Sequence, residues 1–70
     1  MRNMQEIKAA ATEAGVHDWS VHSITTLGRM TRVAIRVGKG VFVAIVPVGN
    51  VASGARMAFG LARDERGAAT

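Results

Sequence analysis

The stretch that decides the fold runs from residue 30 to residue 48 and reads MTRVAIRVGKGVFVAIVPV. Residues 30–37 alternate between two sets of side chains, and only one of these sets contains the two arginines. This is the two-residue period of a half-buried strand. Residues 41–46 predict a return strand that is apolar on both faces. Because Pro47 has no N–H to donate a hydrogen bond to a neighbouring strand, we expect this strand to end there or to lie at an edge of the sheet.

The segment Gly38-Lys39-Gly40 predicts the hairpin connection, because glycine readily adopts the positive φ angles that such turns need. A two-residue loop would shift the pairing of the strands by one residue relative to a three-residue loop. We prefer the three-residue loop because it pairs the apolar sets with each other on the core face: Val33, Ile35 and Val37 with Ile45, Val43 and Val41. The exposed face then carries Arg32 and Arg36 together with Phe42.

A helix is expected on each side of this region. Residues 4–14 place apolar side chains at helical spacing, with Asn3 as the N-cap and Gly15 as the residue that ends the helix. Residues 51–65 predict a second helix with Asn50 as its N-cap.

The remaining strand comes from residues 18–27, which are rich in β-branched residues and contain Trp19. Gly28 and Arg29 mark the turn that follows. The order is therefore α-β-β-β-α over a single domain of residues 1–70, with residues 67–70 expected to fray. We predict an α+β fold in which two helices pack on one face of a three-stranded antiparallel sheet.

Length and composition limit the classes of function. A chain of 70 residues without cysteine has no disulfide and no thiolate metal site, and it is near the lower size limit for folding alone. Oligomerisation is a common remedy for such small domains. The longest apolar run, residues 41–48, is far too short to cross a membrane, and the N-terminus lacks the apolar segment of a signal peptide. We expect a cytoplasmic protein without metal or cofactor.

The net charge of +4 is unevenly distributed along the chain. Residues 1–18 sum to −1 and residues 64–70 sum to −1, whereas residues 19–63 contain six basic residues and no acidic one. A positive charge in the folded middle of a chain predicts a basic surface, in contrast to a flexible basic tail.

The exposed hairpin face is the best candidate for function. A guanidinium near an aromatic ring can contact phosphate and stack on bases, which is how single-stranded nucleic acids are bound. Arg32, Arg36 and Lys39 would make the contacts, with Phe42 as the stacking residue. Three further cations are candidates for extending the site: Arg29, Arg56 and Arg63.

Three alternatives remain open. The arginines could simply keep an apolar sheet soluble, while Phe42 and Val46 form a homodimer in which bare sheet faces pair. The same face, or the acidic side of the first helix with Glu6 and Glu13, could bind a foreign protein, for example part of a host nucleic-acid machine. A protein partner of the basic face would present an acidic surface. A chain that binds in this way would be an inhibitor encoded by a phage or mobile element.

Catalysis is not expected. His17, Asp18, Ser20 and His22 include the residue types of a hydrolytic triad, but their spacing places no carboxylate behind an imidazole. His17 and His22 also lack a third metal ligand at suitable spacing. The chain is thus expected to act by binding.

The α-β-β-β-α order is similar to that of double-stranded-RNA-binding domains. This resemblance covers nearly the whole chain and concerns the topology alone. That family carries a lysine-rich start to its second helix and a Gly-Pro-x-His-like loop after its first strand. Here the corresponding segments are residues 50–54, NVASG, and residues 27–30, LGRM, so no binding residue can be transferred. The order also resembles three-stranded DNA-binding modules of integrases, and the small size and lack of motifs resemble anti-CRISPR proteins.

Overall fold

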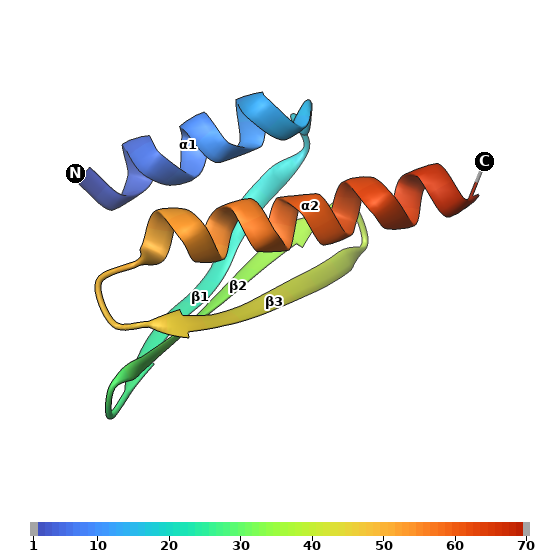
Figure 1. Cartoon of the computed structure of the whole chain (residues 1–70). Coiled ribbons are helices and arrows are strands. Elements are labelled where there is room, and N and C mark those ends of the chain that lie inside the picture. The colour runs from blue at the N-terminus through green and yellow to red at the C-terminus, as the bar shows by residue number, and fades with distance from the viewer. Residues whose placement is uncertain (1, 70) are drawn as a thin grey trace.

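The computed structural model describes the backbone of residues 2–69 and the side chains of residues 3–67. It has the predicted α-β-β-β-α order, shown in Figure 1. The elements are α1 (Arg2–Ala14), β1 (Trp19–Leu27), β2 (Met30–Val37), β3 (Gly40–Pro47) and α2 (Val51–Ala69). The strands form one antiparallel sheet in the order β1-β2-β3, so the predicted α+β fold is confirmed.

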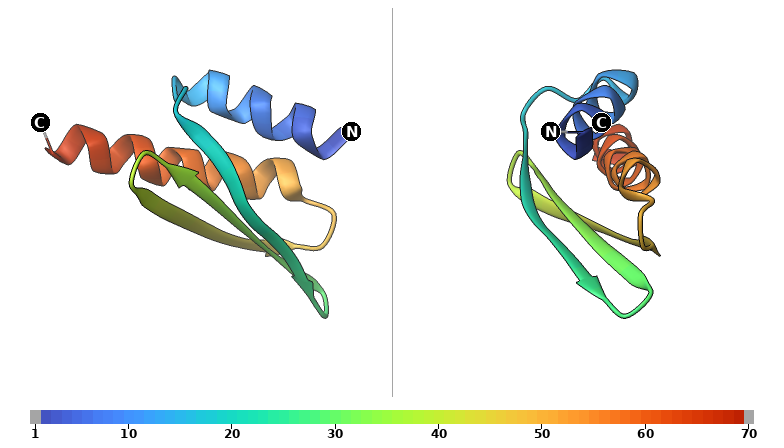
Figure 2. Two further views of the ribbon diagram at one scale, coloured as in Figure 1. Left: turned by 180° about the vertical axis from the view of Figure 1, so that it is seen from behind. Right: turned by 90° about the vertical axis from the view of Figure 1, so that its left-hand side faces the viewer.

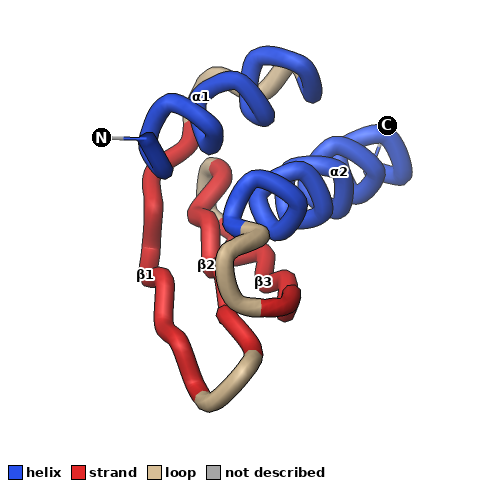
Figure 3. The backbone as a smooth tube through the Cα atoms, turned by 60° about the vertical axis from the view of Figure 1, so that its left-hand side comes forward, coloured by secondary structure: helices blue, strands red, loops and turns tan. Residues whose placement is uncertain are grey.

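Both helices lie on the same side of the sheet, as the two views of Figure 2 show. α2 packs over β2 and β3, whereas α1 packs mainly against α2 and lies above the start of β1 (Figure 3). The core fills the space between these layers. Its largest fully buried side chains include Phe59 from α2, Ile7 from α1, and Val33 and Ile35 from β2. The face of β2 that we assigned to the core is therefore confirmed.

α1 ends as the sequence indicates. Gly15 has a φ of 73°, and its N–H donates to the carbonyl oxygen of Thr12 at 3.1 Å. The N–H of Val16 donates to the carbonyl oxygen of Ala11 at 2.9 Å, which completes a Schellman motif with a buried apolar residue after the glycine. The start of the helix differs, because α1 already includes Arg2 and Asn3. Asn3 is consequently a residue of the first turn, and the prediction that it is the N-cap was wrong.

α2 begins where Asn50 predicts. The carbonyl oxygen of Asn50 accepts the first helical hydrogen bond, from the N–H of Gly54 at 3.1 Å, and Gly49 makes the preceding turn with a φ of 92°. The helix continues to Ala69, beyond the predicted end at residue 65. Residues 67–69, which we expected to fray, are helical, while Thr70 lies outside the described residues.

Both hairpin turns contain two residues, a glycine followed by a cation. Gly28 and Gly38 have φ angles of 61° and 59°, while Arg29 and Lys39 have negative φ. This combination fits type II′ turns, whose twist matches that of the flanking strands. The preferred three-residue loop was therefore wrong: Val37 pairs with Gly40 and Ile35 with Phe42.

The shift of one residue moves every side chain of β3 to the opposite face from the one predicted. Phe42 lies on the helix side, partly buried against the core, and does not share a face with the arginines. Val41, Val43 and Ile45 lie on the opposite face instead, where Val41 and Ile45 are exposed and Val43 is partly buried.

Candidate functional site

The face of the sheet opposite the helices carries the candidate site. The middle strand β2 presents Arg32, Ala34 and Arg36 on this face, and the register shows which neighbours lie beside them. We call this surface the basic face and define it by the following residues: Ser20, Ser23, Thr25, Arg32, Ala34, Arg36, Val41, Val43 and Ile45.

Arg32 and Arg36 are both exposed and lie four residues apart on one strand, which separates their Cα atoms by about 14 Å. Arg36 lies between Ser20 of β1 and Val41 of β3. Arg32 lies in the same way between Thr25 and Ile45. Neither arginine makes an ion pair with any of the described residues. Their guanidinium groups are therefore available to a partner.

Arg29 and Lys39 lie at the two ends of this row of cations. Each is the exposed second residue of a turn, before β2 and after it respectively. The eight residues of β2 span about 27 Å, so the four cations follow one strand along most of the sheet. Neither turn residue makes an ion pair within the described part of the chain. The structure thus places four of the seven site residues suggested by the sequence in one row along β2, with Lys39 also lining the hollow that contains Phe42 and Glu65.

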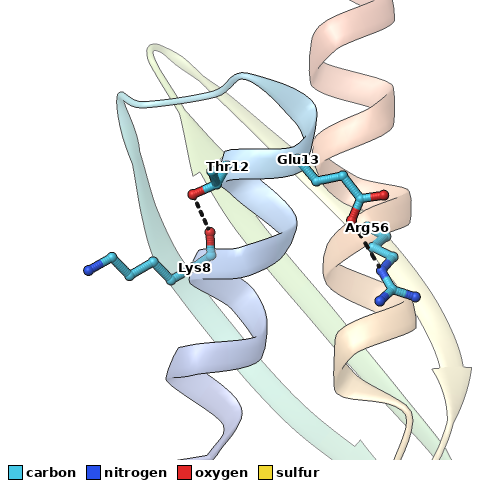
Figure 4. A network of polar contacts seen from close by, with 4 residues as sticks. All are labelled: Lys8, Thr12, Glu13 and Arg56. Carbon is cyan, nitrogen blue, oxygen red and sulfur yellow. Dashed lines mark hydrogen bonds and ion pairs between the residues drawn. The ribbon is translucent and has the colours of Figure 1, made fainter.

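Arg56 and Arg63 lie elsewhere, in the helix layer. They line a hollow of about 100 Å³ between α1 and α2, next to Ala10 and Gly60. The Arg56 Nε atom is 3.9 Å from Glu13 Oε2, a pair shown in Figure 4, and the Arg63 Nε atom is 3.6 Å from Asp64 Oδ1. The idea that these two arginines extend the hairpin patch is not supported, because the sheet separates them from the basic face.

Acidic side chains are segregated from the basic face. All five belong to α1, to α2 or to the loop between α1 and β1: Glu6, Glu13, Asp18, Asp64 and Glu65. The structure therefore adds a spatial separation to the charge asymmetry of the sequence. An anion that approaches the basic face meets no carboxylate on it.

Asp18 fixes the turn that presents Lys39. Its carbonyl oxygen accepts a hydrogen bond from the N–H of Gly38 at 3.0 Å, and its carboxylate accepts one from Arg66 Nη2 at 2.5 Å. The hydrogen bond from Arg66 lowers the pKa of Asp18 below its ordinary value of 3.8, and its backbone hydrogen bond acts in the same direction. The same contact raises the pKa of Arg66. This ion pair joins the end of α2 to the loop before β1, and the carbonyl oxygen of the same Asp18 holds the β2–β3 turn.

The histidines and nearby polar residues do not assemble into a catalytic group in this structure. The Asp18 carboxylate is engaged by Arg66, and no hydrogen bond joins it to an imidazole among the described residues. His22 is exposed at a β-bulge, where the pairing of β1 shifts between Val21 and Ser23. Within residues 2–69, no three metal-ligating side chains lie close enough together to hold an ion.

All three aromatic residues, Trp19, Phe42 and Phe59, belong to or pack against the core on the helix side of the sheet. Trp19 packs edge-on against Phe59, with ring centroids 5.6 Å apart and an interplanar angle of 82°. Phe42 lines a hollow of about 200 Å³ near the β2–β3 turn, with Val37 and Ala62. Trp19 is therefore a packing residue, and the basic face has no aromatic side chain for base stacking.

The apolar residues of the basic face were missed at the sequence level. Val41 and Ile45 are 42% and 60% exposed, although the predicted register placed them in the core. The sequence signal that identifies them is the repeat of glycine followed by a cation at both turns, which favours two-residue loops. Their exposure gives the basic face a mixed character, with arginines beside β-branched side chains.

Comparisons with models of known protein families, with curated proteins and with solved structures found no match for this chain. Over the described residues, neither helix combines the length and the apolar character needed to cross a bilayer.

Proposed function

We propose that this chain is a non-enzymatic binding protein whose basic face contacts the phosphate backbone of a nucleic acid. The observation that supports the proposal is the row of four cations along β2, none of which is ion-paired within the described residues: Arg29, Arg32, Arg36 and Lys39. Phosphates are the strongest anionic partners of such a row, because each contact releases condensed counterions. This partner also makes the cytoplasm the expected location.

The missing aromatic residue refines the mode of binding. Protein surfaces that bind single-stranded nucleic acid gain about 1–3 kcal/mol of binding free energy from each base stacked on an aromatic ring. With Phe42 turned toward the core, the basic face lacks this contribution. We therefore expect recognition of the backbone with little dependence on base sequence, and no preference for single strands over duplexes.

Mobility shifts on single-stranded and duplex probes over a salt series test the proposal. If the four cations each neutralise one phosphate, the slope of log K against log salt concentration should be about −3.6 for duplex DNA and about −2.8 for a single strand. Replacing Arg32 and Arg36 by alanine should reduce the magnitude of the duplex slope by about 1.8 and weaken binding to every sequence.

A matched control removes two charges from the other side of the molecule. Arg56→Ala with Arg63→Ala lowers the net charge by the same amount but leaves the basic face intact. Binding should be almost unchanged in this variant. Equal losses of affinity in the two double variants would show that only the net charge matters. The proposal that the basic face binds the nucleic acid would then be wrong.

A protein partner with an acidic surface is the second candidate, and the exposed apolar side chains of the basic face favour it. Ile45 and Val41 lie directly beside Arg32 and Arg36, an arrangement typical of a protein interface with apolar contacts and charged neighbours. An inhibitor of a host nucleic-acid machine would bind in this way. Co-purification of a partner that persists after nuclease treatment and is lost with Ile45→Asp supports this candidate; loss on nuclease treatment alone argues against it.

A further inference from the structure

The outer edge of β3 has unpaired backbone groups in a fixed pattern. The N–H of Val48 donates to the carbonyl oxygen of Arg29 at 2.9 Å, so Val48 faces β2. Residues in an antiparallel strand face the partner strand alternately, and thus Phe42, Ala44 and Val46 also face β2. The intervening residues direct their N–H and C=O groups away from the sheet: Val41, Val43 and Ile45. No other described segment runs alongside this edge in Figures 1 and 2.

The composition of β3 makes this edge unusual. Its sequence, GVFVAIVP, has no charged or polar side chain, whereas proteins normally protect an exposed edge with charges, prolines within the strand or bulges. β1, at the opposite edge, has such protection in the bulge near His22 and in its serines and threonines. Pro47 stands only at the very end of β3, so it blocks none of the three outward residues.

α2 continues this apolar surface on the helix side. Gly54 lies against Val33 and Val46 of the sheet, and Met57 and Leu61 follow it at spacings of three and four residues along the same flank of the helix. Both are about half exposed, at 52% and 51%. The opposite flank, with Arg56, faces α1. The exposed apolar flank of α2 is therefore the one that lies on the β3 side.

We propose that a second copy of this chain pairs with the outer edge of β3 and forms a two-fold symmetric, six-stranded sheet. An isologous interface requires a surface that is complementary to itself. The edge of β3 meets this requirement, because its outward residues Val41 and Ile45 lie at equal distances on either side of Val43. Antiparallel pairing centred on Val43 places Val41 opposite Ile45 of the partner subunit and joins the two Val43 residues across the axis. All three outward residues of each copy then gain backbone partners, and Pro47 remains outside the new ladder.

Charge favours this edge pairing over pairing of the two basic faces. Packed sheets lie about 10 Å apart, so face-to-face association would enclose the arginines of both copies between two sheets and remove them from water. In the edge-paired sheet, Arg36 and Arg32 of the partner subunit are separated by three strand spacings, about 14 Å. This exceeds the screening length of about 8–10 Å at moderate ionic strength, so their repulsion is weak.

The dimer would also change the basic face. Arg32 and Arg36 lie about 14 Å apart along the strand, so the two copies would place four arginines at the corners of a square about 14 Å on each side. The dimer itself does not depend on the proposed nucleic-acid binding, but that binding would gain a second row of cations. The oligomeric state and the binding can be measured separately, which distinguishes failure of one from failure of the other.

Sedimentation velocity of the full chain over a concentration series tests the dimer. The expected mass is twice the 7.4 kDa of one chain, and a wild type that remains monomeric at millimolar concentration overturns the proposal. Val43→Pro removes the N–H at the two-fold axis, a group that the monomer leaves unpaired. This variant should dissociate at least about tenfold more readily because the hydrogen bonds at the axis are lost, while circular dichroism shows a retained fold.

If Val43→Pro fails to fold, the flank of α2 provides the decisive variant. Met57→Glu with Leu61→Glu places four carboxylates near the axis of the dimer and should make the chain monomeric. The control is Arg56→Ala with Arg63→Ala on the opposite flank of the same helix, which should leave the mass unchanged. A dimer that survives Met57→Glu with Leu61→Glu, or one that is abolished equally by the control, rules out the β3 edge as the interface.

Discussion

Gly54 and Gly60 occupy the same helix, but the space around them differs. A Cβ atom at Gly54 would lie 2.8 Å from Cγ2 of Val33 and 3.2 Å from Cγ2 of Val46, whereas a Cβ at Gly60 would meet nothing within 4 Å. Val33 is fully buried and short, so it cannot swing away. Gly54 thus allows α2 to approach the sheet closely, while Gly60 only weakens the helix.

Alanine at these two positions should therefore have opposite effects. Each substitution gains about 1 kcal/mol of helix propensity, but Gly54→Ala also overpacks the core at a cost of about 1–3 kcal/mol. We expect Gly60→Ala to raise the free energy of unfolding by up to about 1 kcal/mol and Gly54→Ala to lower it. Urea unfolding at one protein concentration measures both. Equal stability of the two variants would contradict the close packing at Gly54.

Residue identity also explains why the face of Phe42 could not be predicted from the apolar pattern. In β2 the arginines distinguish the two faces, and the assignment of Val33 and Ile35 to the core was right. β3 is apolar on both faces, so either register buries hydrophobic side chains, and the pairing of apolar sets that favoured the three-residue loop does not distinguish the two faces. Turn chemistry carried the missing information, because a glycine in the first position of a two-residue loop favours a type II′ turn.

At the scale of elements, the ion pair between Asp18 and Arg66 links α2 to the loop before β1 across 48 residues of sequence. The pKa of Asp18 is lowered in the folded state, mainly by the hydrogen bond from Arg66. A carboxyl group with a depressed folded pKa contributes stability above its unfolded pKa and loses that contribution as the pH falls through the folded value. The contribution of this pair is therefore complete at neutral pH and disappears only below pH 3.8.

An NMR titration of the Asp18 carboxyl group checks this contact. Its midpoint should lie below 3.8 in the wild type and return toward that value in Arg66→Ala. The control is Arg56→Ala, which removes a guanidinium that faces Glu13 at 3.9 Å and should leave the Asp18 midpoint unchanged. An Asp18 midpoint that is the same in both proteins would show that Arg66 does not hold the carboxylate in solution.

The order and types of the elements followed from periodicity and from glycines and prolines, but their contacts did not. Gly15 and Asn50 marked one end of each helix correctly through backbone hydrogen bonds that depend on neighbouring residues alone. The positions of Arg56 and Arg63 depend on how α1 crosses α2, which no local signal encodes. The sequence grouped them with the cations of the hairpin by charge alone, whereas the fold places them in the helix layer on the other side of the sheet.

At the scale of the whole molecule, the sheet divides the charges into two layers. The basic face carries unpaired arginines, whereas the helix layer holds carboxylates together with the cations that pair with them. Exposed ion pairs contribute at most about 1 kcal/mol, so charge substitutions in either layer should leave the fold intact. Differences in binding between the two double arginine variants can then be attributed to the layer that was changed.

The alternation of backbone groups along β3 gives a prediction that joins the fold of one chain to the assembly of two. In a single chain, the amides of Phe42, Ala44 and Val46 are bonded to β2, while those of Val41, Val43 and Ile45 face solvent. Hydrogen exchange at low protein concentration should therefore be slow and fast at alternate residues along the strand. If two copies pair at this edge, raising the concentration should slow the three outward amides and leave the inward ones unchanged. Outward amides that stay fast at every concentration would show that β3 remains the edge of a three-stranded sheet. Alternation of the opposite phase at low concentration, with Val41, Val43 and Ile45 slow, would contradict the observed register.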